Sequence, residues 1–153
     1  MVSTENTAGV AKLIQKYTGA DMLRVFPVDP YPAAYRACVD QSIIEVKESY
    51  KPPLQAYSVD SSQYDTVFLG TPNWCGTFAP PLLTFMSSHD FTGKIILPFC
   101  THGGAGQRNF TAHMKEHFPE NDLRETLVLY EDGGFNAAYF VYDWLNELIS
   151  LDK

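Results

Sequence analysis

The chain has 153 residues, of which 45 % are hydrophobic and 19 % are charged, the balance of a folded protein rather than a disordered one. It carries 18 acidic and 11 basic residues, and the formal net charge of −7 disfavours binding to nucleic acid or to anionic membranes. No apolar run approaches the roughly 20 residues of a membrane span, and the polar first residues give no sign of a signal peptide. We therefore expect a single domain over residues 1–153, located in the cytoplasm.

The first part of the chain predicts two helices and one strand. Apolar residues at helical spacing predict a helix over residues 7–18, which ends at Gly19. The apolar residues 22–28 predict a short strand. A proline-rich turn then leads into a second predicted helix over residues 33–49.

After a loop that runs to Asp65, strands and helices alternate. Apolar runs predict strands over residues 66–70, 94–99 and 126–130, and periodic patterns predict helices over residues 80–89, 107–117 and 136–150. Residues 71–73 are expected to form a turn. Strands that are apolar throughout are typical of a parallel sheet with both faces covered. The pattern predicts a three-layer α/β/α sandwich.

Three loops would meet at the carboxyl edge of this sheet, where open α/β sheets bind their ligands. Residues 3–7 open directly into a helix, and such an N-terminus suits a phosphate, although an ordinary helix cap explains the same residues. Trp74, in the loop 72–77, could stack on a flat ring or simply pack within the loop. The glycine-rich residues 101–106 let backbone amides approach a ligand closely.

Residues 27–32, 68–77 and 98–106 together resemble the flavodoxin-like flavoproteins, most closely a short bacterial flavodoxin family, and the resemblance runs from about residue 3 to the end. It implies a flavodoxin-like fold and bound FMN. The first loop would bind the phosphate and the other two would flank the isoalloxazine ring. The residues on these positions are Ser3, Thr4, Asn6 and Thr7, then Pro72, Asn73, Trp74, Gly76 and Thr77, and finally Thr101, His102, Gly103, Gly104 and Gly106.

Three features depart from the family pattern. Val2 replaces a hydroxyl residue and Glu5 replaces a glycine in the phosphate loop. A carboxylate about 4 Å from a phosphate would cost up to ~4 kcal/mol, unless it points to solvent. The family also begins with a central strand of about six residues, whereas only Met1 and Val2 precede the loop here. We therefore expect a sheet without its first strand, and either a start further upstream or a truncated copy with impaired FMN binding.

The resemblance implies electron transfer, or the reduction of a small acceptor such as a quinone, by an FMN-dependent oxidoreductase or, preferably, an electron carrier. The acidic surface would suit a basic redox partner protein. A monomer and a homodimer are both compatible with the sequence. The alternative is a flavodoxin-fold binding or interaction module with weak or lost FMN binding, which Glu5, Val2 and the short N-terminus favour.

The remaining candidate residues have simpler explanations. Cys75 and Cys100 could take part in redox chemistry, but packing is the more common role of cysteine. His102 could donate a hydrogen bond to a reduced flavin or serve only to hold its loop. His113 and His117 are spaced for a metal site, yet no acidic partner pattern accompanies them, so a solvated helix face is the better interpretation.

Overall fold

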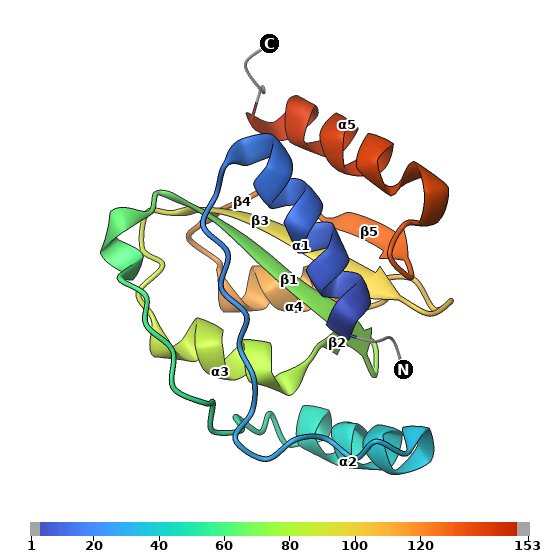
Figure 1. Cartoon of the computed structure of the whole chain (residues 1–153). Helices are drawn as coiled ribbons and strands as arrows, with labels where there is room; N and C mark the ends of the chain where they lie inside the picture. Colours follow the sequence, from blue (N-terminus) through green and yellow to red (C-terminus); the bar gives the residue numbers. More distant parts are fainter. Residues whose placement is uncertain (1–3, 150–153) are drawn as a thin grey trace.

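The computed structural model describes residues 4–149 and places a sheet between two layers of helices (Figure 1). The helices are α1 (Thr4–Thr18), α2 (Tyr35–Lys47), α3 (Pro80–Ser88), α4 (Phe110–His117) and α5 (Ala137–Ile149). In Figure 1, α1 and α5 cover one face of the sheet, while α3 and α4 cover the other. Helix α2 lies beyond α3, away from the sheet. The predicted α/β/α sandwich is confirmed.

The sheet is mixed but mainly parallel. Its strands are β1 (Thr66–Trp74), β2 (Thr77–Phe78), β3 (Ile95–His102), β4 (Asp122–Leu123) and β5 (Leu127–Tyr130). Strand β3 lies at the centre, with β1 parallel to it on one side and both β4 and β5 parallel to it on the other. The short β2 folds back antiparallel on the end of β1. The turn predicted over residues 71–73 is wrong, because these residues continue β1.

Two apolar cores explain why the strands are hydrophobic throughout. Side chains from alternate positions of β3 point to opposite faces. Ile96 and Cys100 pack with residues of α3 and α4, whereas Leu97 and Phe99 pack with residues of α1 and α5. On β1, Gly70 provides room for the ring of Phe99, which would overlap with any added Cβ atom. The two cores attach both helical layers to the central strand.

The strand predicted over residues 22–28 is wrong. These residues form a single bridge, between Pro27 and Leu54, flanked by hydrogen bonds from Val28 N to Pro53 O and from Gln55 N to Phe26 O, each 2.8 Å. Within residues 4–65, no segment enters the sheet. The segment 22–28 therefore has no neighbouring strand with which to pair. Pro27 also lacks the backbone N–H that a ladder would need at its position.

In the part of the chain that the structure describes, most of one side of β1 has no strand beside it. Within the described residues, β1 pairs with β3 along its length and with β2 only at Asn73 and Trp74. The other backbone groups on that side, from Thr66 to Pro72, have no strand beside them. Pro72 is tolerated at this position because proline, which lacks an N–H, is found on edge strands.

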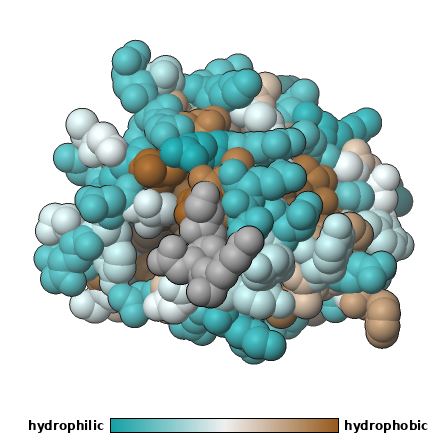
Figure 2. All heavy atoms as spheres, turned by 90° about the horizontal axis from the view of Figure 1, so that it is seen from above, coloured by the Kyte–Doolittle hydropathy of each residue, from teal (hydrophilic) through white to brown (hydrophobic). Residues whose placement is uncertain are grey.

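One face of the molecule is largely polar. The face shown in Figure 2 is mainly hydrophilic, and apolar side chains emerge only in small patches between polar ones. In the part of the chain that the structure describes, no helix combines the length and the hydropathy required to cross a membrane.

Candidate functional site

The register of β1 against β3 brings the predicted loops together. Thr71 pairs with Cys100, and Pro72 pairs with Thr101, so the two strands reach the same edge of the sheet. The N-terminal end of α1 lies near this edge, beside β2 (Figure 1). The three segments that the sequence singled out therefore converge in space, as far as they fall within the described residues. Ser3 lies outside them, and the side chain of Thr4 is not described.

A hydrogen bond connects the first segment to the third. The Oγ1 atoms of Thr7 and Thr101 lie 2.7 Å apart, and the two residues are 8 % and 1 % exposed. The bond joins the first turns of α1 to the end of β3. Asn6, one position earlier, is half-buried. The helix N-terminus is therefore held at a defined position beside the loop that follows β3.

Asn73 connects the second segment to the third. Its Nδ2 donates to the backbone oxygens of Gly106 and Gln107 at 2.8 and 2.9 Å, and its Oδ1 accepts from the N–H of Gly76 at 2.9 Å. Gly76 has φ +86°, a conformation that a residue with a side chain rarely adopts. Three hydrogen bonds of this one amide reach the two loops, so Asn73 fixes their separation.

His102 organises the glycine-rich loop. Its Nδ1 accepts hydrogen bonds from the backbone N–H groups of Gly104 and Gly106, both at 3.1 Å. Nδ1 must therefore be the unprotonated nitrogen, which leaves Nε2 free to donate. Its ring also packs against Tyr130 with the centroids 5.8 Å apart. Gly103 and Gly104 are exposed, so the loop presents backbone atoms to solvent.

Trp74 is buried in this structure. It is 6 % exposed and packs edge-to-face on Tyr31, with the ring centroids 4.6 Å apart. Its indole Nε1 is buried and has no hydrogen-bond partner among the described residues. An unpaired buried donor costs about 1–3 kcal/mol, so an acceptor from a ligand would relieve an existing penalty.

The hydroxyl of Tyr31, which covers Trp74, donates to Glu45 Oε2 at 2.5 Å. Burial, followed by this bond, raises the pKa of Tyr31. Tyr31 therefore stays neutral and keeps its donor role. Sequence reasoning had placed it in a family motif without giving it a role in the site.

The two threonines of the second segment have structural partners. Thr71 Oγ1 accepts from the N–H of Ala79 at 2.9 Å, and Thr77 Oγ1 lies 2.7 Å from His113 Nδ1. The solvated-face interpretation of His113 is therefore wrong, since its ring is half-buried against β2. Within residues 4–149, no group of three His, Cys, Asp or Glu residues is placed to hold a metal ion.

Glu5, the acidic departure in the phosphate segment, forms an ion pair. Arg24 Nη2 donates to Glu5 Oε1 at 2.6 Å, and this bond lowers the pKa of the Glu5 carboxyl. The Arg24 guanidinium also lies over the ring of Phe26, 5.1 Å from its centroid. Arg24 thus brings a positive charge to the first turn of α1. The sequence did not reveal this pair, because Arg24 lies 19 positions after Glu5, in a segment without regular structure.

A groove of about 440 Å³ runs along the open side of β1, between α1 and α3. We call it the β1 groove. Its lining is mainly apolar, and Thr7, Thr71, Pro72 and Trp74 lie among its lining residues at the carboxyl edge. Its volume lies in the range of cofactor and small-molecule sites. The predicted site thus opens into a cavity that lies beside the unpaired side of β1.

A model of the flavodoxin family matches residues 1–148 of the chain. No curated protein matches it. A protein identified as a candidate flavoprotein from Bacteroides uniformis is 26 % identical, with a TM-score of 0.81 over 94 % of this chain and 92 % of that one. A second candidate flavoprotein, from Bacteroides eggerthii, has the same TM-score of 0.81 at 24 % identity, over 94 % and 90 % of the two chains. A flavoprotein from Lactobacillus acidophilus, crystallised in complex with FMN, has a TM-score of 0.70 at 19 % identity, over 90 % and 89 %.

Proposed function

Because the chain belongs to the flavodoxin family, we propose that it binds FMN at the carboxyl edge of its sheet and serves as an electron carrier or reduces a small acceptor. The observation that carries the proposal is the unpartnered N–H of Trp74, which is buried where the loops after β1 and β3 and the start of α1 converge. A flavin has several oxygen and nitrogen acceptors that could pair with it. The neighbour in complex with FMN adds support at the level of the fold.

The residues at this edge suit FMN in charge and in hydrogen bonding. The first turn of α1 offers backbone N–H groups and the positive end of a helix dipole to a phosphate. Arg24 offsets the carboxylate of Glu5, the residue that would otherwise repel this phosphate. Asn73 and His102 hold the two loops that would flank the ring. Nε2 of His102 remains available as a donor.

When bound, FMN supplies the redox chemistry, since its ring accepts and returns electrons, while the protein binds it, orients it and controls access to it. Thr7 and Thr101 set the position of the helix relative to the loop. Asn73 keeps the space between the loops open. The net charge of −7 would assist association with a basic partner and weaken it with an acidic one.

The test is a titration of the protein with FMN, in which the quenching of flavin fluorescence measures binding. We expect Arg24→Gln to weaken binding about fivefold, because the positive charge that offsets Glu5 near the phosphate is then removed, at a cost of about 1 kcal/mol for one exposed charge. The double variant Arg24→Gln with Glu5→Gln should recover most of the affinity. Arg36→Gln, at an arginine whose side chain is 90 % exposed on α2, is the matched control and should not change it.

Trp74→Phe tests the hydrogen bond to the indole. Phenylalanine keeps an aromatic ring against Tyr31 but lacks the N–H, so FMN affinity should fall about 3- to 10-fold, the value of one hydrogen bond. A wild-type protein that is colourless and takes up no added FMN would refute the proposal. It would support the alternative, an interaction module that has kept the fold and lost the flavin.

The acceptor can be identified with the reduced holoprotein in a stopped-flow instrument. Reoxidation by a benzoquinone would indicate the reduction of a small acceptor. Fast reoxidation by a basic cytochrome that slows as salt is added would indicate a protein partner, because salt screens the attraction between opposite charges.

A further inference from the structure

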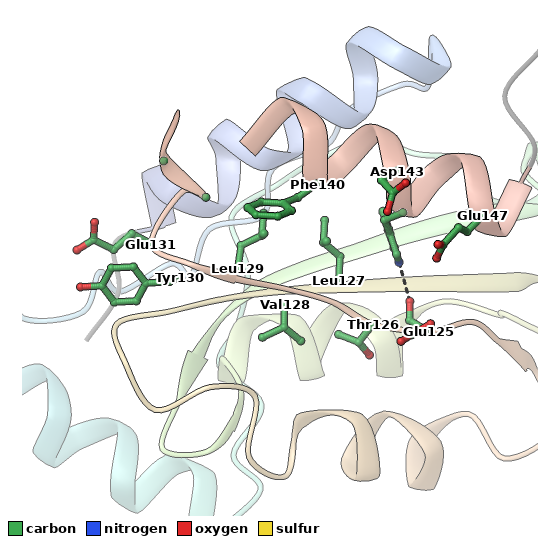
Figure 3. Close-up of a pocket in the computed structure, with 13 residues that line it drawn as sticks. Glu125, Thr126, Leu127, Val128, Leu129, Tyr130, Glu131, Phe140, Asp143 and Glu147 are labelled. Atoms are coloured by element: carbon green, nitrogen blue, oxygen red, sulfur yellow. Dashed lines mark hydrogen bonds between the residues drawn. The ribbon is translucent and has the colours of Figure 1, made fainter. Parts of the chain in front are cut away.

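The outer edge of the sheet carries a second groove, far from the open side of β1. It has a volume of about 530 Å³ and follows residues 125–131, which include β5 (Figure 3). Every residue of this run lines the groove, both those that point to the α5 face and those that point away. A groove that touches consecutive residues of a strand is bordered by the backbone of that strand. We call it the β5 groove.

The backbone along this groove is open to pairing. Among residues 4–149, β5 pairs only with β3, in the register Phe99 with Leu127 to His102 with Tyr130. The opposite side of β5 has no strand beside it. An extended edge of this kind is a template on which another chain can add a strand.

One side of α5 forms the wall of the groove. Phe140, Asp143, Trp144 and Glu147 line it, and their spacing of three, one and three positions places them on one stripe of the helix. In Figure 3, Phe140 projects from α5 toward β5, and Leu127 and Leu129 point from the strand toward the helix. Trp144 Nε1 donates to the backbone oxygen of Glu125 at 2.8 Å and closes the gap between helix and strand at that end. Phe140 is 43 % exposed and leaves an apolar surface in the middle.

The charges around the groove have one sign. Glu125 and Glu131 lie at its two ends, and Asp143 and Glu147 lie one turn apart on α5; all four are exposed. Among the residues that the structure describes, no lysine or arginine lines it. The nearest basic residue in sequence, Arg124, is bonded to the carboxylate of Asp122 and to the backbone oxygen of Leu148. The strand itself, from Leu127 to Tyr130, has four residues and covers about 13 Å at ~3.3 Å per residue.

We propose that the β5 groove binds a basic, extended segment of a partner protein, which adds a strand to the edge of the sheet. The unpaired backbone groups of β5 can form hydrogen bonds with an added strand. The carboxylates around the groove favour a strand that is rich in lysine or arginine. Basic side chains on one face of the added strand would reach Asp143 and Glu147, with their aliphatic stems on Phe140. Small apolar side chains on its other face would lie beside Val128, which points away from α5 (Figure 3).

A second copy of this chain is a poor occupant of the groove. Pairing of β5 with β5 would bring two sets of carboxylates together, and like charges placed opposite each other on adjacent strands are destabilising. The carboxylates around the β5 groove therefore disfavour pairing with a second copy and favour binding of a basic partner. The proposal goes beyond FMN binding and does not depend on it, because every group it uses lies on β5, on the residues that flank it, or on α5.

The test uses a fluorescent peptide of about seven residues that alternates lysine and valine, long enough to pair with all four residues of β5 and to extend past both ends. Binding is followed by fluorescence anisotropy. The same peptide with N-methyl groups on alternate amides keeps its charge but cannot form the ladder, and we expect it to bind at least ten times more weakly. A peptide of glutamate and valine should not bind. Hydrogen exchange should slow at the amides of residues 127–130 when the lysine peptide is added.

Matched variants distinguish binding in the β5 groove from nonspecific attraction between the peptide and the acidic protein. The double variant Asp143→Asn with Glu147→Gln should weaken the lysine peptide about fivefold, as expected for two exposed ion pairs. Glu116→Gln with Glu120→Gln removes the same charge from exposed positions elsewhere and should have less than a twofold effect. Equal losses in both variants, equal binding of the N-methylated peptide, or no protection of β5 would each overturn the proposal. Peptide binding by a protein that takes up no FMN would support it while refuting the flavin proposal.

Discussion

Thr7 and Thr101 share a buried hydrogen bond of 2.7 Å although 94 positions separate them in the chain. One belongs to the start of α1 and the other to the end of β3, so the bond fixes the distance between a helix N-terminus and a glycine-rich loop. We expect Thr7→Val to lower the free energy of unfolding by about 1–3 kcal/mol, because Thr101 would keep a buried hydroxyl without its partner. Urea titration measures the effect.

The control for this change is Ser87→Ala, at an exposed serine on α3, which should alter the unfolding free energy by less than about 0.5 kcal/mol. If the two variants are equally stable, the bond contributes nothing to the fold. If Thr7→Val also leaves FMN affinity unchanged, the helix position does not matter for the flavin.

Two glycines should respond in opposite ways to alanine. Gly70→Ala should be strongly destabilising, by more than about 2 kcal/mol, since the new methyl group would overlap with the ring of Phe99 in the core. Gly9→Ala should stabilise the protein by about 0.5–1 kcal/mol, because Gly9 lies within α1 and a Cβ there meets no atom within 4 Å. Thermal unfolding of both variants tests the packing of α1 and β1 on β3. The same sign for both changes would contradict it.

Acid should destabilise the fold through several exposed carboxyls. Hydrogen bonds from Arg24 to Glu5, from Thr92 to Asp90 and from Arg124 to Asp122 hold the pKa values of these groups below their ordinary values of 4.5 for Glu and 3.8 for Asp. A carboxyl with a lowered pKa contributes stability above its unfolded-state pKa and loses it as the pH falls through its folded-state pKa. We expect the urea midpoint to be constant near neutrality and to fall once the pH drops below the ordinary values.

The variant Asp122→Asn checks this account. It should lower the midpoint at neutral pH and make it less sensitive to acid, since it removes one of the titrating groups. A midpoint that falls equally steeply in the variant and the wild type would show that Asp122 is not among the groups responsible.

The three thiols should differ in reactivity. Burial raises the pKa of Cys100 to about 12 and also raises the pKa of Cys38, whereas Cys75 is exposed. The thiolate is the reactive form, so iodoacetamide at mildly alkaline pH should modify Cys75 alone in the folded protein. Mass spectrometry of the labelled protein tests this, and Cys75→Ser should abolish the fast reaction. Rapid modification of Cys100 would revive a redox role for it.

Periodicity predicted the layers of this fold well. The apolar stripes of α1 and α5 and the hydrophobic runs of β1, β3 and β5 were read correctly, because each buries its side chains in one of the two cores. The strand at residues 22–28 was predicted wrongly for a physical reason. An apolar pattern shows that side chains can be covered, but a strand also needs a neighbour, and the position next to β1 is empty among the described residues.

The sequence predicted the loops of the candidate site, but not the side chains that contact the residues of these loops. Motif positions led to Asn73 and His102, and the structure adds that both hold backbone groups of the glycine-rich loop. Sequence alone could not reveal that Arg24 pairs with Glu5, since Arg24 lies in a segment without regular structure. It also could not reveal that Tyr31 covers Trp74, because that contact depends on how residues 27–34 fold back over the end of β1. The role of these residues in binding FMN stays a prediction.

The β1 groove has a practical consequence for anyone who measures the stability of this protein. Environment-sensitive dyes that report melting become fluorescent when they enter an apolar cavity, and here such a cavity is open in the native fold. The fluorescence should therefore be high before heating and should decrease when a ligand enters the groove. A dye-based melting curve would then resemble that of a partly unfolded sample, although circular dichroism of the same solution would show an intact fold.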